Sequence, residues 1–183
     1  VYHCTSSYPT PTREQNLDVI KTFKEKLSQK YGVLVGFSDN GDDMIVPADA
    51  VRLGAVSIEK HMTLDKKMDG PDHRASLNTE EFREMVNLIR EAESSPSKEI
   101  KHPEALGDGV KKVQPSEVNN IEFFRKAVRA RNDMAEGDKV TIDLLIPKRT
   151  RGRQSPMDFE QLLDKNLKTS VVADQEITSE MVE

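Results

Sequence analysis

The residues best suited to chemistry lie between positions 58 and 76, where a strand-like apolar run becomes polar and ionisable before it breaks at Gly70-Pro71. Alternate side chains of an extended strand share a face, so Glu59 and His61 point one way and Lys60 the other. A carboxylate and an imidazole at a strand end are typical of an active-site rim where strands are followed by loops and helices. A single Glu-x-His pattern is nevertheless more typical of a solvated strand end.

Length and composition restrict the class of protein. The chain has 183 residues, of which 36% are hydrophobic and 32% charged, enough for one domain or somewhat more. A net charge of −5 argues against non-specific nucleic-acid binding, and no apolar run approaches the ~20 residues that span a bilayer. We expect neither nucleic acid nor membrane as a partner. The single Cys4 excludes an internal disulfide and is compatible with the cytoplasm, the expected location.

The elements that must position these residues follow from hydrophobic periodicity. Apolar runs predict strands over residues 1–5, 33–37 and 55–61, and helical spacing predicts helices over residues 12–30, 43–53 and 78–93. Thr12 with Gln15 and Asn78 with Glu81 resemble capping boxes, and Pro47 is tolerated if it lies in the first helical turn. Such alternation predicts parallel strands with covering helices, an α/β fold.

Three strand–helix units neither close a barrel nor make a well-covered sheet. We therefore expect further strands upstream of Val1 or dependence on another chain, and we interpret the chain as the later part of a longer protein. Residues 94–119 are polar and rich in proline, which predicts a linker. Short β segments near 128–130 and 144–146, with a helical turn or two at 158–163, predict a second, small domain over residues 120–183. The cationic run 148–153, taken alone, is most simply a solvated basic loop.

Six short motifs occur in order along almost the whole chain. They are YHCTSSYPTP at 2–11, VGFSD at 35–39, IEKHMTLD at 58–65, GPDH at 70–73, KR at 148–149 and SPM at 155–157. Together and in this order they are specific, and they resemble the motifs of the sialic acid synthase family, the enzymes that make N-acetylneuraminate and related nonulosonic acids.

The resemblance implies a fold and an assembly. Residues 1–93 would be the last three βα units, the C-terminal portion, of a TIM (β/α)8 barrel, and residues 120–183 a small, mostly β, antifreeze-like (SAF, β-clip) domain. Members of the family are typically dimers in which the small domain of one subunit covers the barrel mouth of the other. A domain-swapped homodimer is therefore expected.

The resemblance also implies a reaction. Phosphoenolpyruvate would condense with an N-acetylated amino sugar, such as N-acetylmannosamine, and phosphate would leave. A divalent cation, Mn²⁺ or Mg²⁺, would polarise the aldehyde as a Lewis acid. His61 matches one family metal ligand, and Glu59 on the same face is the candidate orienting or acid/base group.

Several further positions match family residues that contact substrate. Tyr8, Ser38 and Asp72 match positions that contact the sugar or the phosphoenolpyruvate, and Ser6 falls where some members have Asn. Arg149 matches the arginine that the small domain extends into the partner's active site. A guanidinium suits that position because its planar donors engage an acyl oxygen or a carboxylate while staying charged.

One departure from the family pattern lies in the metal site. The family normally has Ser-Asp-His-Thr, whose histidine is the second metal ligand, whereas this chain has Asn40 there. An amide oxygen binds Mg²⁺ or Mn²⁺ but is a weaker donor than imidazole for a transition metal, so lower metal affinity is expected. Two hypotheses follow: a metal-assisted synthase, or a non-catalytic paralogue or sugar-binding module of the same fold that has lost the metal site.

Overall fold

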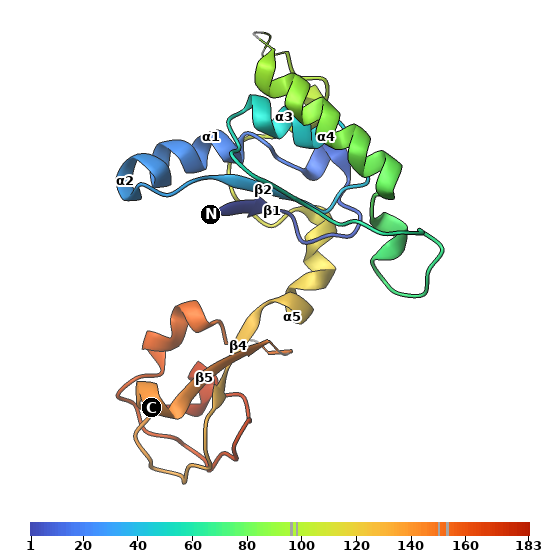
Figure 1. Ribbon diagram of the computed structural model, residues 1–183. Coiled ribbons are helices and arrows are strands. Elements are labelled where there is room, and N and C mark those ends of the chain that lie inside the picture. Colours follow the sequence, from blue (N-terminus) through green and yellow to red (C-terminus); the bar gives the residue numbers. More distant parts are fainter. Residues whose placement is uncertain (96, 98, 150, 153) are drawn as a thin grey trace. The chain divides into compact units, whose positions relative to one another are not determined.

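The protein consists of two compact units, Val1–Val118 and Asn119–Glu183 (Figure 1). The structure is a computed structural model that describes every residue except Pro96, Lys98, Thr150 and Arg153. Each unit has its own cluster of buried apolar side chains. Within the described residues, no helix combines the length and the apolar character needed to cross a membrane.

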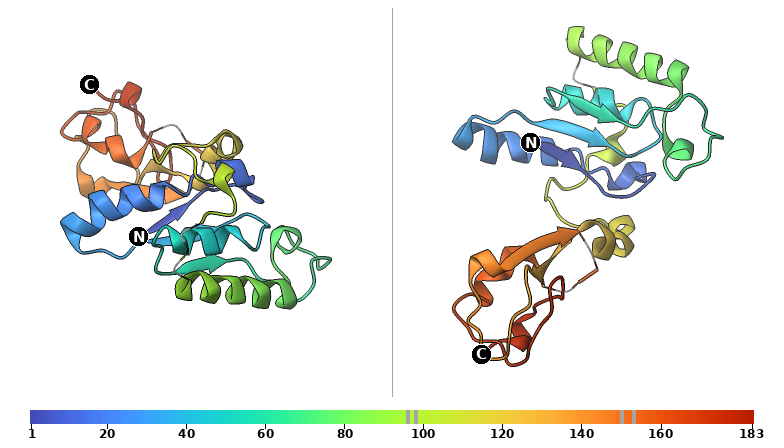
Figure 2. Two further views of the ribbon diagram at one scale, coloured as in Figure 1. Left: turned by 90° about the horizontal axis from the view of Figure 1, so that it is seen from above. Right: turned by 60° about the horizontal axis from the view of Figure 1, so that its bottom comes forward.

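A parallel sheet lies at the centre of the first unit. Its strands are β1 (Tyr2–Cys4), β2 (Gly36–Asp39) and β3 (Ile58–Lys60), in that spatial order. Parallel neighbours need a crossover connection, and the helices that supply it lie along the sheet in the views of Figures 1 and 2. The predicted alternation of strands and helices in an α/β fold is confirmed.

The strands begin later than the apolar runs suggested. The run predicted as a strand from Val33 becomes β2 only at Gly36, which pairs with Tyr2. Leu34, which the apolar run placed inside the strand, precedes this first pair and is 71% exposed. Likewise β3 starts at Ile58 rather than at Ala55, because its first partner is Phe37.

The first helix also differs from the prediction. It was expected from Thr12, but residues Thr12–Glu14 form a separate 3-10 turn and the helix starts at Val19. Asn16 has a left-handed φ of 51°, which interrupts a right-handed helix. The predicted cap is therefore wrong; Gln15 instead donates its side-chain Nε2 to Asp39, at 2.9 Å. The helical segment runs through α1 (Val19–Phe23), a π turn at Lys24–Ser28 and α2 (Gln29–Tyr31).

The two other helices follow the prediction closely. Helix α3 (Val46–Arg52) carries Pro47 in its first turn, where its missing N–H costs no hydrogen bond. Helix α4 (Thr79–Ser94) begins at the predicted Asn78 cap. The Asn78 side chain accepts from two backbone N–H groups, and the Glu81 side chain accepts from the Asn78 backbone N–H. The predicted capping box is confirmed.

Replacing Asn78 by alanine is expected to lower the free energy of unfolding by about 1 kcal/mol, because two N–H groups of the first turn lose their acceptor. Urea denaturation measures this. Asn78→Asp keeps an acceptor oxygen and serves as the control, with stability close to that of the parent. Equal stability of the alanine variant and the parent would contradict a stabilising cap.

The apolar core of the first unit lies between the sheet and its helices. One cluster joins β2 to α1 and α3, and a second joins α3 to α4. The side chains at their centres are Leu17, Ile20, Phe37, Val46 and Ala50 in the first, and Ala48, Leu77, Met85, Ile89 and Ala92 in the second. Burial on this face leaves the other face of the strands to carry polar residues.

The stretch 94–119, expected as a linker, is largely part of the first unit. Its Ala105 is fully buried in the core, and the Ala105 carbonyl accepts from Leu17 N at 2.8 Å. The backbone N–H groups of Lys101 and His102 donate to the buried Asp49 carboxylate. These contacts hold the stretch against the helices, and the division between the units falls after Val118.

The second unit is small and rich in short β contacts. After α5 (Ile121–Phe124), the strands β4 (Lys126–Ala130) and β5 (Leu145–Arg149) pair antiparallel, as the predicted segments near 128–130 and 144–146 suggested. Single bridges such as Met134 to Val171 extend the pairing, and a 3-10 turn occupies Pro156–Gln161. Of the predicted basic run, Thr150 and Arg153 lie outside the described residues.

Candidate active site

The strand register divides the sheet into an apolar face and a polar face. His3, Phe37 and Ile58 are register partners, and Phe37 and Ile58 pack into the apolar core under the helices. The next row is Cys4, Ser38 and Glu59, whose side chains point to the opposite face. Ser38 and Glu59, two predicted site residues, therefore stand side by side on the face away from the helices.

A short hydrogen bond joins these two residues. The Ser38 hydroxyl, on a residue only 8% exposed, donates to Glu59 Oε1 at 2.6 Å. A bond to a carboxylate at this distance is charge-assisted and fixes the orientation of the acceptor. The Glu59 side chain is exposed, so its second oxygen can meet a ligand.

Asn40 follows β2 and is held by the residues at the end of β1. Its side-chain nitrogen donates to Thr5 O at 2.8 Å and lies 3.3 Å from Cys4 Sγ. The backbone carbonyl of Asn40 accepts from Thr10 N at 2.9 Å. The residue is 5% exposed. Because the amide nitrogen is occupied, the amide oxygen is the atom that Asn40 can offer to a cation.

Tyr8 lies beside His61, which follows β3. Their ring centroids are 5.4 Å apart with the planes at 84°, an edge-to-face contact. Burial is the main cause that raises the pKa of the Tyr8 phenol, and the negative charges of Asp72 and Glu59 act in the same direction. Tyr8 is therefore a neutral hydroxyl near neutral pH. Tyr8, in the segment after β1, thus lies close to His61 in the loop after β3.

Asp72 lies in the loop after β3, where it precedes the 3-10 turn His73–Ala75. Its backbone carbonyl accepts from the Ser76 hydroxyl at 2.7 Å, and its carboxylate is exposed. His73 contacts Thr63 Oγ1 through Nδ1 at 2.7 Å. The loop is thus braced from within, and Asp72 remains available to a ligand.

Ser6 is held in a way the sequence did not suggest. Its backbone N–H donates to Glu117 Oε1 at 2.8 Å, and Glu117 Oε2 accepts from Gln114 N at 2.8 Å. Lys111 Nζ donates to the carbonyl of neighbouring Cys4. The segment once expected to be a linker therefore braces the loop that carries Ser6 and Tyr8.

Replacing Glu117 by alanine is expected to lower the free energy of unfolding by about 1–2 kcal/mol, because two backbone N–H groups lose a charged acceptor. Guanidinium chloride denaturation followed by circular dichroism measures the change. Glu117→Gln retains one acceptor oxygen, so roughly half of the loss is expected. If alanine and glutamine leave stability unchanged, the brace contributes nothing.

The second group that sequence reasoning missed is an ion pair on the helix-facing side. Lys60 Nζ lies 2.6 Å from Asp39 Oδ2, and both side chains are at most 1% exposed. Strand alternation predicted that Lys60 points away from Glu59, which is confirmed. The partner of Lys60 was not predicted, because it depends on the register between β2 and β3.

A cation at this site would rely on few protein donors. Within the described part of the chain, no three His, Cys, Asp or Glu side chains are grouped to hold a metal ion. His61 is half-buried, and neither of its ring nitrogens bonds to another described residue. One imidazole nitrogen and one amide oxygen suit a hard divalent ion that takes its remaining ligands from water or substrate.

Arg149 ends β5 in the second unit. Its guanidinium Nε donates to Phe123 O at 2.9 Å, and its Cζ lies 4.7 Å from the centre of the Phe124 ring. Arg151 stacks in the same way on Phe123, also at 4.7 Å. These cation–π contacts hold both exposed cations on one aromatic pair. Arg149 belongs to a preformed cationic surface of its own unit.

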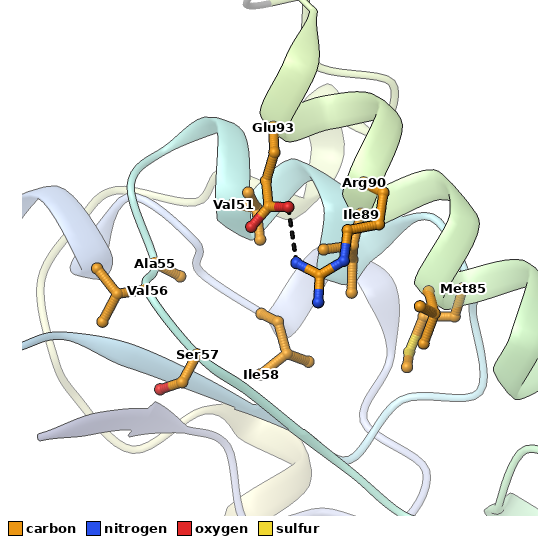
Figure 3. Close-up of a pocket in the computed structure, with 10 residues that line it drawn as sticks. Val51, Ala55, Val56, Ser57, Ile58, Met85, Ile89, Arg90 and Glu93 are labelled. Atoms are coloured by element: carbon orange, nitrogen blue, oxygen red, sulfur yellow. Dashed lines mark hydrogen bonds and ion pairs between the residues drawn. The ribbon is translucent and has the colours of Figure 1, made fainter.

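A groove on the helix side of the sheet is distinct from the site residues. It encloses about 210 Å³ between α3, α4 and β3, and Figure 3 shows Arg90 and Glu93 ion-paired beside it, with 2.7 Å between the paired atoms. Its lining is mostly aliphatic, from residues such as Val51, Ile58 and Ile89. None of the predicted site residues lines this groove.

The fold and site define a class: a parallel α/β unit whose polar residues gather where strands β2 and β3 end. Residues 1–101 match the model of the NeuB family, and the chain belongs to that family.

Individual relatives agree with this assignment. The chain is 37% identical over 163 residues to N,N'-diacetyllegionaminic acid synthase of Campylobacter jejuni, covering 89% of this chain and 45% of that protein. It is 32% identical over 181 residues to human N-acetylneuraminate-9-phosphate synthase, covering 98% and 47%. The chain thus spans about half the length of these curated relatives.

A solved structure resembles the entire chain. The crystal structure of spore coat polysaccharide biosynthesis protein SpsE from Bacillus subtilis superposes with a TM-score of 0.80 at 29% identity, over 100% of this chain and 52% of that one. The match includes the second unit as well as the first.

Proposed function

We propose that this chain is part of a nonulosonic acid synthase, which condenses phosphoenolpyruvate with an N-acetylated amino sugar and releases phosphate. The observation that carries the proposal is the gathering of Ser38, Asn40, Glu59 and His61 at the carboxyl ends of two adjacent parallel strands. Active sites of parallel α/β folds form at these ends. Membership of the NeuB family and the printed activities of the relatives support this reaction class.

Each residue takes a role that its surroundings allow. Glu59, oriented by the Ser38 hydroxyl, is the acid/base or orienting group beside the reacting carbonyl. Tyr8 is a neutral hydroxyl whose pKa burial raises, so it donates a hydrogen bond to a substrate oxygen. Asp72 and the loop at Ser6 supply further polar contacts to the sugar.

His61 and the amide oxygen of Asn40 would hold the divalent cation, Mn²⁺ or Mg²⁺. A bound cation would polarise the aldehyde oxygen of the sugar as a Lewis acid. With an amide in place of a second imidazole, the site favours an oxygen-loving ion and binds it less tightly. The edge-to-face contact with Tyr8 would help to orient the His61 ring for this role.

The second unit completes the proposal. Residues 120–183 would form the antifreeze-like domain, and residues 1–93 the last three βα units of a TIM barrel. In a domain-swapped homodimer, Arg149 would reach the barrel mouth of the partner and bind a carboxylate there. Its stacking on Phe124 supports this role, because the cation is already oriented and exposed.

Phosphate release tests the proposal. The protein expressed from its complete reading frame is supplied with phosphoenolpyruvate, Mn²⁺, and in turn N-acetylmannosamine and di-N-acetylated deoxyhexoses. Release of phosphate that depends on one of these sugars is the expected result. A folded protein that releases phosphate with none of them would refute the proposal.

The alternative is a sugar-binding relative that has lost catalysis, which Asn40 specifically favours. Calorimetry with Mn²⁺ separates the two functions. Binding that disappears in His61→Ala and is strengthened in Asn40→His supports the synthase. Sugar binding without any Mn²⁺ binding supports the non-catalytic relative.

A further inference from the structure

A buried polar network lies directly beneath the candidate site, on the opposite side of the sheet. Lys60 stands between Glu59 and His61 in the chain but points to the helix side. Its ammonium group meets three acceptors: Asp39 Oδ2 at 2.6 Å, Gly41 O at 2.8 Å and Asp43 O at 3.1 Å. An ammonium has three protons, so all of its donors are used.

Both carboxylate oxygens of Asp39 accept hydrogen bonds as well. Its Oδ2 faces Lys60, while its Oδ1 accepts from Gln15 Nε2 at 2.9 Å and from Gly41 N at 2.7 Å. Asp39 stands between Ser38 and Asn40 in the chain. Along the chain, each member of the pair therefore stands between two candidate site residues, one before it in the strand and one directly after the strand.

The network joins the end of β3 to the segments that follow β1 and β2. Gln15 comes from the segment after β1, Gly41 and Asp43 come from the loop after β2, and Lys60 ends β3. The backbone of Asn40 is thereby fixed on both sides, by Asp39 and by Gly41. The three hydrogen bonds of the Lys60 ammonium also fix the orientation of the end of β3.

Stability alone does not explain such a pair. Burying two charges costs solvation that their attraction only partly returns, and apolar residues of similar shape often serve stability as well or better. A fully hydrogen-bonded pair instead has one geometry, because each donor and acceptor already has its partner. The feature that an apolar replacement would not reproduce is that geometry.

We propose that Asp39 and Lys60 are positioning residues, whose buried ion pair sets the relative placement of Asn40 and His61 on the polar face of the sheet. Neither side chain faces that side, so neither contacts substrate there. The consequence for catalysis rests on the proposed function, whereas the placement itself does not.

The test replaces the pair by uncharged residues of similar shape in Asp39→Asn/Lys60→Met. The introduced asparagine keeps an acceptor oxygen for Gln15 and Gly41, and no buried charge remains unpaired. The matched control is Asp49→Asn/Arg52→Met, which removes another buried ion pair, with 2.9 Å between its charged atoms, from α3. Asp49 also accepts from the backbone N–H groups of Lys101 and His102, and asparagine at position 49 keeps an acceptor oxygen for them. Within the described residues, the side chains of this pair bond to none of the loops after β1 and β3.

Two measurements are made on the full chain and both variants. Proton–carbon NMR of the histidine rings reports the ring-current shift that Tyr8 imposes on His61. Phosphate release gives kcat and KM separately. For the site variant we expect the His61 shift to collapse and kcat to fall about 10–100-fold with KM nearly unchanged, since misplacement of catalytic groups by about 1 Å has effects of this size. The control variant is expected to match the parent in both.

The results separate the two claims. A folded site variant with the parent's His61 shift and kcat would overturn the positioning role. If the parent itself releases no phosphate, the proposed function fails and the His61 shift still decides the inference. Should the double variant not fold, Lys60→Arg keeps the charge but cannot place three donors as an ammonium does. The same collapse of the His61 shift is expected there, and an unchanged shift would refute the proposal.

Discussion

Replacing Glu59 by glutamine is expected to lower kcat/KM for phosphate release by about 100-fold or more, the usual contribution of a positioned acid/base group. Glutamine has the size of glutamate, and its side-chain oxygen can still accept from the Ser38 hydroxyl that now donates to Glu59 at 2.6 Å. The fold and substrate contacts are therefore retained. What disappears is the negative charge and the ability to exchange a proton.

The control for this variant is Glu80→Gln, which makes the same change on an exposed residue in the first turn of α4. Initial rates are measured over a range of both substrates, with circular dichroism as a check on folding. The control should have the parent's rate. If folded Glu59→Gln keeps more than about a third of the parent's kcat/KM, Glu59 has no acid/base role.

Local patterns predicted the parts of the site that depend on one strand or one helix end. The two-residue period of a strand is enough to place Glu59 and Lys60 on opposite faces. The Asn78 cap needs only residues three positions apart. Such features follow from sequence because every atom involved lies within a few residues.

Contacts between distant segments could not be predicted in this way. Ser6 and Glu117 are 111 residues apart, and nothing near either position indicates the other. Lys60 finds Asp39 only because β2 and β3 pair in one register. The polar composition of residues 94–119 suggested a linker, yet the Lys101 backbone N–H donates to Asp49 and the Glu117 carboxylate accepts from the Ser6 backbone. A polar segment can be ordered by hydrogen bonds rather than by apolar burial.

The boundaries of β2 and of the first helix illustrate a further limit. Val33 and Leu34 have strand-forming side chains, but no strand lies beside them, since the pairing starts at Tyr2 and Gly36. Thr12 and Gln15 have the right spacing for a cap, but Gln15 is drawn to the buried Asp39. In both cases tertiary partners decided between alternatives that local propensity left equal.

Acidification is expected to destabilise the first unit through His3. This side chain is 1% exposed, packs against Phe37 at a ring-centroid distance of 5.9 Å, and donates Nε2–H to Gln15 O at 2.7 Å. Burial lowers the pKa of His3 from 6.5 to about 4. The folded protein therefore holds His3 neutral at a pH where the unfolded chain has already bound a proton.

This difference in proton binding decides whether the free energy of unfolding rises or falls with pH. The unfolded state binds more protons between pH 6.5 and pH 4, so the contribution of His3 is complete above pH 6.5 and is lost as the pH falls toward 4. The expected loss in the free energy of unfolding is about 2 kcal/mol by pH 5 and about 3 kcal/mol by pH 4.

Urea denaturation at pH 7.5, 6 and 5 measures this loss in the parent and in His3→Gln. Glutamine does not titrate, so between pH 7.5 and pH 5 the free energy of unfolding of His3→Gln should fall by about 2 kcal/mol less than that of the parent. This holds whatever the stability of the variant at pH 7.5. The pKa of His102 is raised, chiefly by its hydrogen bond to Glu104, so His102 changes the free energy of unfolding in the opposite direction as the pH falls. This change is the same in both proteins and cancels in the comparison. Parallel pH profiles for parent and variant would mean that His3 is not held neutral by its burial.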